Sequence, residues 1–243
     1  MSYAYGLSIA ASAALVLREG PTSLVARRHA WVHAAYGVRL CLFLLWRELS
    51  VPRFRQLREK IERRAPPGNR LSRAPFVLGC SFLYFCMSLP LVMSARAPAA
   101  VGARQTMGAL FTSLAWAGFG LAALGDTYKS FAKAARGERA LVTGGPFAVL
   151  RHPNYQGEQL LWTASTFAGL ALAPISTKAA ATAAASLLGL AGINFVLVQA
   201  TTGLNSRHKL VYGEDMAFRT WSAWKGVEFK KADANPSGVS TLY

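Results

Sequence analysis

The chain has 243 residues, of which 53% are apolar and only 16% are charged. This composition is too apolar for one or two soluble domains and indicates a membrane protein. The net charge of +16, from 27 Lys and Arg against 11 Asp and Glu, is compatible with nucleic acid, an anionic membrane surface or phosphate-bearing ligands. The three cysteines lie in apolar stretches without metal-ligand spacing, so no metal site is expected.

Six apolar stretches have, or nearly have, the length that a helix needs to cross roughly 30 Å of hydrocarbon. The first stretch lacks the basic leader and cleavage site of a secretory signal, so we interpret it as a retained span. The sequence therefore predicts an all-α, multi-pass transmembrane bundle of about six helices in a single domain over residues 1–231. The predicted spans are Tyr3–Leu17, Trp31–Trp46, Pro75–Ala95, Met107–Gly125, Gln159–Ile175 and Ala179–Thr202.

The basic residues are unevenly divided between the two sides of this bundle. Six spans place segments 47–74, 126–158 and 203–243 on one side, and these carry twenty of the 27 Lys and Arg residues. The positive-inside rule puts that side in the cytosol or its equivalent, although it does not identify the organelle. Membrane topology and anionic lipid headgroups explain the charge, so membrane lipids are expected partners and nucleic acid is not.

Two segments outside the predicted spans have a distinct character. Pro52 to Lys60, continued by Arg63 and Arg64, has the pattern of a basic amphipathic helix on the membrane surface. Residues 232–243 are small and polar without apolar periodicity, which predicts a flexible C-terminal tail.

Charged side chains are rare in membrane helices, so those within the second predicted span require an explanation. For Arg39, a charge paired inside the bundle and a ligand for phosphate or substrate are equally consistent with the sequence. For His33, we favour an interfacial histidine near Arg27 and Arg28.

The segment 126–158 concentrates polar groups at the mouth of the bundle. Asp126 and Lys129 are expected at a helix end about one turn apart, where they can pair. Further along, Arg151, His152 and Asn154 precede a helix expected to start near residue 157 or 158. A guanidinium fork, side-chain donors and a helix N-terminus together suit an anionic phosphate. On composition alone, we favour the interpretation that Arg151 and Tyr155 are ordinary interface anchors.

The run Arg-His-Pro-Asn-Tyr-x-Gly-Glu, with an aromatic residue one turn later, is complete here as Arg151 to Glu158 with Trp162. This run and three further segments resemble the steroid 5-alpha-reductase-like membrane proteins. The three segments are Gly125 to Phe131, Thr143 to Phe147 and Tyr36 to Leu40. That superfamily also contains sterol C=C reductases and, more distantly, isoprenylcysteine carboxyl methyltransferase. The resemblance covers nearly the whole chain and is strongest at residues 125–162.

This resemblance implies a cofactor site on the basic face and an apolar substrate that enters between helices from the bilayer. The cofactor is NADPH or, in the methyltransferase branch, S-adenosylmethionine. Tyr155 and Glu158 are the implied proton-handling groups. The implied cofactor-binding residues are Arg151, His152, Asn154, Lys129, Asp126, Arg39 and Trp162.

The resemblance thus implies an NADPH-dependent oxidoreductase that acts on a CH–CH bond of an apolar lipid or steroid-like molecule. One alternative is an S-adenosylmethionine-dependent lipid or prenyl methyltransferase, and another is a non-catalytic scaffold or subunit of a larger membrane complex. The chain departs from the superfamily at Asn205, where a glutamate is usual, and its second span lacks the acid of true steroid reductases.

Overall fold

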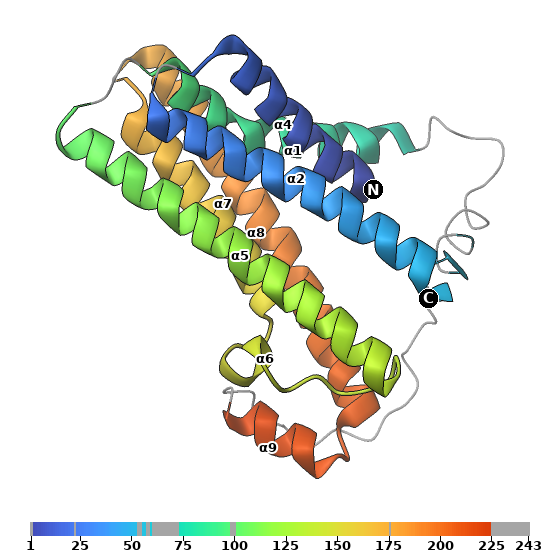
Figure 1. Cartoon of the computed structure of the whole chain (residues 1–243). Coiled ribbons are helices and arrows are strands. Elements are labelled where there is room, and N and C mark those ends of the chain that lie inside the picture. The colour runs from blue at the N-terminus through green and yellow to red at the C-terminus, as the bar shows by residue number, and fades with distance from the viewer. Residues whose placement is uncertain are drawn as a thin grey trace.

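The computed structural model describes residues 2–21, 23–52, 55–56, 59, 73–97, 101–174 and 176–224. These residues form helices and connecting turns, without a strand among them, which confirms the predicted all-α class (Figure 1). The helices are α1 (Ser2–Glu19), α2 (Leu24–Ser50), α4 (Ala74–Arg96), α5 (Ala103–Arg136), α6 (Pro146–Val149), α7 (Pro153–Leu172), α8 (Thr177–Tyr212) and α9 (Met216–Trp224).

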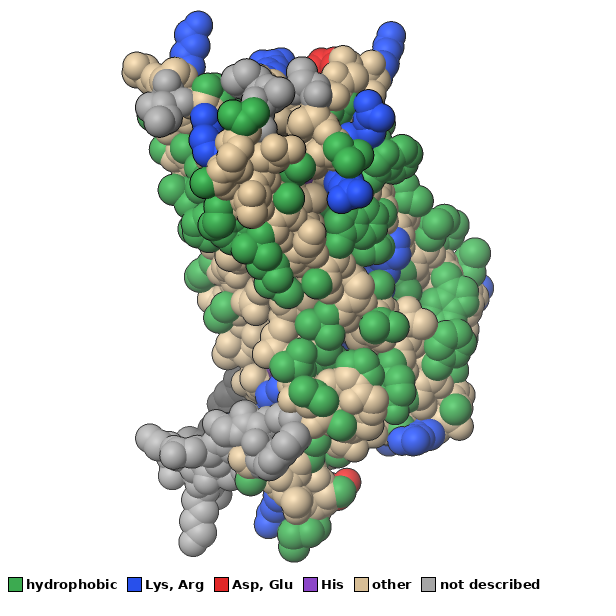
Figure 2. All heavy atoms as spheres, turned by 60° about the vertical axis from the view of Figure 1, so that its left-hand side comes forward, with side chains coloured by type: hydrophobic (Ala, Val, Ile, Leu, Met, Phe, Trp, Pro, Cys, Tyr) green, Lys and Arg blue, Asp and Glu red, His purple; other side chains and the backbone are tan. Residues whose placement is uncertain are grey.

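A long helix contains most or all of each predicted span. Three of them, α4, α5 and α8, are long and apolar enough to cross a membrane. Figure 2 shows apolar side chains over the flank of the bundle, while Lys and Arg side chains gather toward its two ends. The protein is therefore a helical membrane protein, and the six-span threading with its cytosolic basic side remains a prediction.

Helices α5 and α8 extend well beyond their predicted ends. They contain 34 and 36 residues, so at 1.5 Å per residue each is more than about 50 Å long, against roughly 30 Å of hydrocarbon. The prediction that Asp126 and Lys129 lie at a helix end was wrong, because α5 continues to Arg136. Both extensions point toward the end of the bundle that carries α6 and α9 (Figure 1).

Helices α5 and α7 pack with their backbones almost in contact, through glycines. A Cβ atom added at Gly118 would lie 2.5 Å from the Leu161 nitrogen, and one at Gly157 would lie 2.4 Å from the Ala122 nitrogen. Lipid provides little hydrophobic drive for helix association, so close van der Waals contact across small residues must hold such a seam together. Helix α7 is therefore fixed against α5 along its first half.

Two predicted segments fall outside the part of the chain that can be assessed. The surface helix predicted from Pro52 to Lys60 lies largely outside the described residues, and the predicted tail at 232–243 lies entirely outside them.

Candidate functional site

Two hydrogen-bonded groups form from the predicted site residues, and the first lies between α2, α5 and α7. We call Arg39, Asp126 and Asn154 the inner cluster. Arg39 Nη2 donates to Asp126 Oδ2 at 2.9 Å, and Asn154 Nδ2 donates to Asp126 Oδ1 at 3.1 Å. The Arg39 and Asp126 side chains are only 17% and 15% exposed. The Asp126 carboxylate therefore neutralises Arg39 and does not make its ion pair with Lys129.

Local backbone structure explains how the inner cluster assembles. A Cβ atom at Gly125 would lie 2.7 Å from the Asn154 nitrogen, so only glycine allows the start of α7 to approach α5 this closely. Helix α7 begins at Pro153, earlier than predicted, because proline suits the first turn of a helix. Asn154 is then one residue inside the helix, opposite Asp126. The helix N-terminus that was expected to receive an anion is packed against α5.

Next to the inner cluster, Glu158 on α7 reaches a group of aromatic side chains. Its carboxyl interacts with the Tyr36 hydroxyl of α2, and that hydroxyl donates to the Tyr5 hydroxyl at 3.2 Å. Tyr36 meets the Trp162 ring edge to face at 5.3 Å between centroids. Tyr155 lies on the same core cluster, partly buried. Of the two predicted proton-handling groups, Glu158 thus adjoins a pair of phenol hydroxyls inside the bundle, and Tyr155 packs against the same core.

The second group, which we call the outer cluster, consists of Arg151, His152, Asn205 and Ser222. The amide oxygen of Asn205 on α8 accepts from Arg151 Nε at 2.8 Å and from His152 Nε2 at 2.7 Å. Arg151 Nη1 also donates to the Ser222 hydroxyl of α9 at 2.7 Å, and its guanidinium lies 5.1 Å from the Trp221 ring centroid. The outer cluster therefore joins the start of α7 to α8 and α9.

The outer cluster borders a small cavity whose lining is rich in cations. The cavity has a volume of about 20 Å³, and Lys129, Lys133, Arg151, His152 and His208 line it. This volume is enough for a water molecule but not for a nucleotide. Arg151 Nη2 and His208 Nδ1 are buried here and make no hydrogen bond to another described residue. The cavity thus presents donors and positive charge without a matching anion on its lining.

The electrostatic environment keeps His152 neutral. Burial lowers the pKa of His152, the neighbouring Arg151 and Lys129 cations lower it further, and the hydrogen bond to Asn205 opposes them. Because the Asn205 oxygen can only accept, Nε2 of His152 carries the proton and Nδ1 is left as an acceptor. A neutral His152 adds no charge to a site that already holds several cations.

His33 does not occupy the interfacial position that we favoured from the sequence. It is fully buried with His29, and its Nδ1 donates to the His29 carbonyl at 2.9 Å. Its Nε2 then accepts from Ser165 of α7 at 3.1 Å, while His29 Nε2 donates to the same hydroxyl at 2.8 Å. This histidine pair links α2 to α7 inside the bundle.

The structure thus separates the predicted site residues into two regions. Arg39, Asp126 and Asn154 form the inner cluster, and Tyr155, Glu158 and Trp162 lie beside it in the bundle interior. Arg151, His152 and Lys129 line the cavity at the basic end.

Several residues of these regions were not assigned a place in the site from the sequence. Tyr36 was noted only as part of a motif, and Asn205 only as a departure from a usual glutamate, yet both are hydrogen-bonded to site residues or to their neighbours. Ser222 and Trp221 contact Arg151 across 71 and 70 residues of sequence, and no local signal indicates such a contact.

A comparison with known families places this chain. The family described as a protein of unknown function, DUF1295, matches residues 3–223. The chain belongs to that family. No curated protein and no solved structure matches it.

Proposed function

We propose that this DUF1295 protein is a membrane-embedded, NADPH-dependent reductase of a C=C bond in an apolar lipid or steroid-like molecule. The observation that carries the proposal is Arg151, whose Nη2 is buried without a hydrogen-bond partner among the described residues and whose neighbours on the cavity are Lys129 and Lys133. The resemblance of Arg151 to Glu158 to the steroid 5-alpha-reductase-like proteins supports the same cofactor.

The charge of the cavity favours NADPH over S-adenosylmethionine. NADPH carries a pyrophosphate and a 2′-phosphate, and guanidinium and ammonium groups bind phosphate through charge-assisted hydrogen bonds. S-adenosylmethionine carries a sulfonium cation, which the same lysines and arginine would repel. Asn205 strengthens this preference, because a neutral amide binds Arg151 without cancelling its charge.

The side-chain donors of the small cavity suit phosphate oxygens, but the cavity must become larger to admit the cofactor. Arg151 and Lys129 would hold phosphate oxygens, with His152 and Asn205 keeping the Arg151 guanidinium in place. A cavity of about 20 Å³ cannot contain the cofactor, so α9, which covers Arg151 through Ser222 and Trp221, must move when it binds.

When bound, the nicotinamide supplies a hydride to one carbon of the double bond. The second carbon then needs a proton, and Glu158 and Tyr155 are the acidic groups that can donate it. Tyr36 and Tyr5 continue from Glu158 as hydroxyl groups 3.2 Å apart, so they can hold the Glu158 carboxyl in place. The inner cluster keeps Arg39 paired to Asp126 next to this acid.

A cofactor titration tests the proposal on the purified full chain in detergent. NADPH should raise the thermal midpoint, because a ligand at about 100 times its dissociation constant stabilises the native state by about 2.7 kcal/mol. S-adenosylmethionine should not. Arg151→Lys should reduce the NADPH shift, while Arg136→Ala, an exposed cation on the same helix as Lys129, should leave it intact.

Loss of the NADPH shift in Arg136→Ala as well as in Arg151→Lys would mean that general positive charge binds the nucleotide. A shift with S-adenosylmethionine alone would indicate the methyltransferase, and no shift with either compound would indicate the scaffold. A Glu158→Gln variant then tests turnover. It should keep the NADPH shift but stop NADPH oxidation with a steroid 4-en-3-one or a membrane lipid extract.

A further inference from the structure

A second, larger hollow lies on the flank of the bundle between α2 and α5. Its volume is about 780 Å³ and it opens outward, within the roughly 300–1,000 Å³ that ligand pockets occupy. None of its lining residues borders the small cavity at Arg151. We call this hollow the α2/α5 groove.

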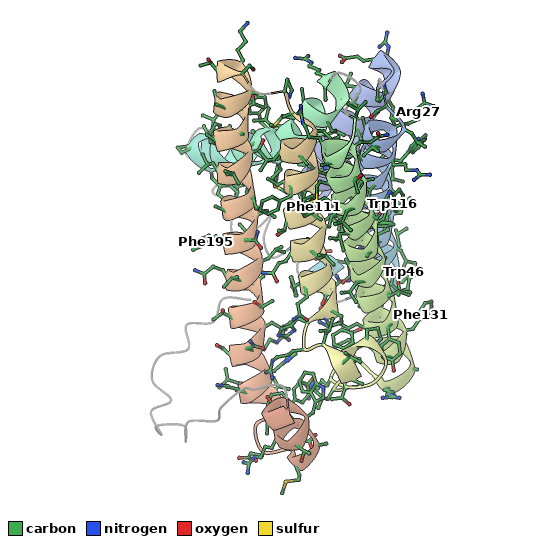
Figure 3. All side chains as sticks on the ribbon, turned by 90° about the vertical axis from the view of Figure 1, so that its left-hand side faces the viewer. Arg27, Trp46, Phe111, Trp116, Phe131 and Phe195 are labelled. Carbon is green, nitrogen blue, oxygen red and sulfur yellow. The ribbon has the colours of Figure 1, made fainter. Side chains whose placement is uncertain are left out.

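The polar lining residues of the groove lie toward one of its ends, next to Val25 and Ala109, and the lining toward Val38 is apolar. Arg28 and Thr112 both line it, and they lie near the same end because Trp116 Nε1 donates to the Arg28 carbonyl at 3.2 Å, one turn of α5 beyond Thr112. From Arg28 the groove follows α2 to Val38. Figure 3 shows Arg27, the neighbour of Arg28, toward the end of the bundle opposite α9, and Trp116 further inward.

The part of the groove between Arg28 and Val38 matches one leaflet of a bilayer in length. Ten residues separate Arg28 from Val38 on α2, which at 1.5 Å per residue is about 15 Å. The hydrocarbon core is roughly 30 Å thick, so its half is about 15 Å. A lipid chain with its headgroup beside Arg28 would extend along the groove to the middle of the membrane.

Arg28 provides the charge at the polar end of the groove. Thr112 on the α5 wall is only 2% exposed, and its hydroxyl lies beneath the surface of the groove. Arg28 is exposed at the same end and offers a guanidinium fork that fits a carboxylate.

We propose that the α2/α5 groove binds a long-chain fatty acid. The Arg28 guanidinium binds the carboxylate, and the chain lies between the Trp31 and Trp116 side chains over Ala34 and Ala35. Arg28 is the one cation among the lining residues, and the groove over the two alanines has room for one chain. Both features suit a lipid with one chain and one negative group. This site goes beyond the reductase proposal, because its occupation requires neither NADPH nor turnover.

Binding of cis-parinaric acid, a fluorescent fatty acid, tests the proposal on the full chain in nanodiscs of neutral phosphatidylcholine without NADPH. Its emission should rise on excitation of tryptophan, because Trp31 and Trp116 line the groove. Palmitate should displace it, whereas hexadecanol, which has the same chain without the carboxylate, should not.

Two matched pairs of variants locate the site. Arg28→Gln should weaken parinaric acid binding by about tenfold, as the loss of a charge-assisted contact implies, while Arg27→Gln should not change it. Both arginines are exposed, but only Arg28 lines the groove. Ala35→Trp should fill the groove and abolish binding, while Ala14→Trp on the exposed face of α1 should have no effect.

Several results would overturn the proposal. These are no binding to the wild type, equal loss in Arg28→Gln and Arg27→Gln, equal displacement by hexadecanol and palmitate, or stronger displacement by phosphatidylglycerol, which would indicate a phospholipid. Because Arg28 is exposed, its substitution is compatible with folding. The comparison of Arg28→Gln with Arg27→Gln therefore tests the proposal even if Ala35→Trp does not fold. None of these results bears on the NADPH titration.

Discussion

The inner and outer clusters are built on the same plan with opposite electrostatic results. In each, one acceptor side chain receives two donors, one of them an arginine: Asp126 receives Arg39 and Asn154, and Asn205 receives Arg151 and His152. Asp126 is charged and cancels the charge of Arg39. Asn205 is neutral and leaves that of Arg151 available. The arginine that is paired with a carboxylate has its charge cancelled, whereas the arginine that is held by an amide keeps its charge.

Removal of Asp126, the acceptor of the inner cluster, should have the largest effect on the free energy of unfolding. Asp126→Ala leaves Arg39 buried without its counter-charge and should reduce the free energy of unfolding by about 3–5 kcal/mol. The double variant Arg39→Met with Asp126→Leu should recover most of this loss, because apolar residues can replace a buried ion pair. Chemical unfolding in detergent measures both, and equal stability of the single and double variants would contradict the structural role.

Removal of the outer acceptor should have a smaller effect. Asn205→Ala leaves Arg151 Nε and His152 Nε2 without their acceptor and should cost about 2 kcal/mol in the same unfolding assay. Asn205→Asp keeps the acceptor and should be at least as stable as the wild type. If Asn205→Asp were as unstable as Asn205→Ala, the hydrogen bonds to Arg151 and His152 would not be what Asn205 contributes.

His152 of the outer cluster should account for part of the pH dependence of the stability of the protein. The pKa of His152 is lowered by burial and by nearby cations, so the unfolded chain binds a proton more readily than the folded one. The stability from neutral His152 is complete above the unfolded pKa of about 6.5. It is lost as the pH falls toward the lowered folded pKa, by at most about 1.4 kcal/mol per pH unit.

His152→Gln isolates this contribution from that of the other histidines, because glutamine keeps a donor for Asn205 but does not titrate. Thermal midpoints of the two proteins between pH 7.5 and 5, a range set around that reference pKa of about 6.5, should converge as the pH falls. Parallel curves would show that His152 is not coupled to folding.

The smallest expected effect concerns α9. Ser222→Ala removes one hydrogen bond to Arg151 and should reduce stability by about 1 kcal/mol. It should also increase hydrogen exchange in Met216–Trp224 more than in α5. Unchanged exchange in this helix would mean that Trp221, which donates to the Phe147 carbonyl at 2.9 Å, holds α9 without Ser222.

The sequence predicted the helices better than the contacts between them. The lengths of the apolar stretches located the six long helices. The fourth span was predicted to end at Gly125 because Asp126, Lys129 and Lys133 are charged, but these residues continue the same helix. The position of His33 was predicted wrongly because two nearby arginines suggested an interface, while its actual partner, Ser165, is 132 residues away. Asn205 was recognised as unusual, but its two donors could be found only in three dimensions.

The glycine seam between α5 and α7 determines which parts of the site can move. Gly118, Gly125 and Gly157 leave no gap between the two backbones, so neither helix can slide or tilt without a collision. This close approach holds Asp126 opposite Asn154, and α7 carries Glu158 in the same frame. If the proposed nucleotide binds, the adjustment falls to α9 and its contacts with Arg151, and ligand entry would then be a local undocking at one end of this pair of helices.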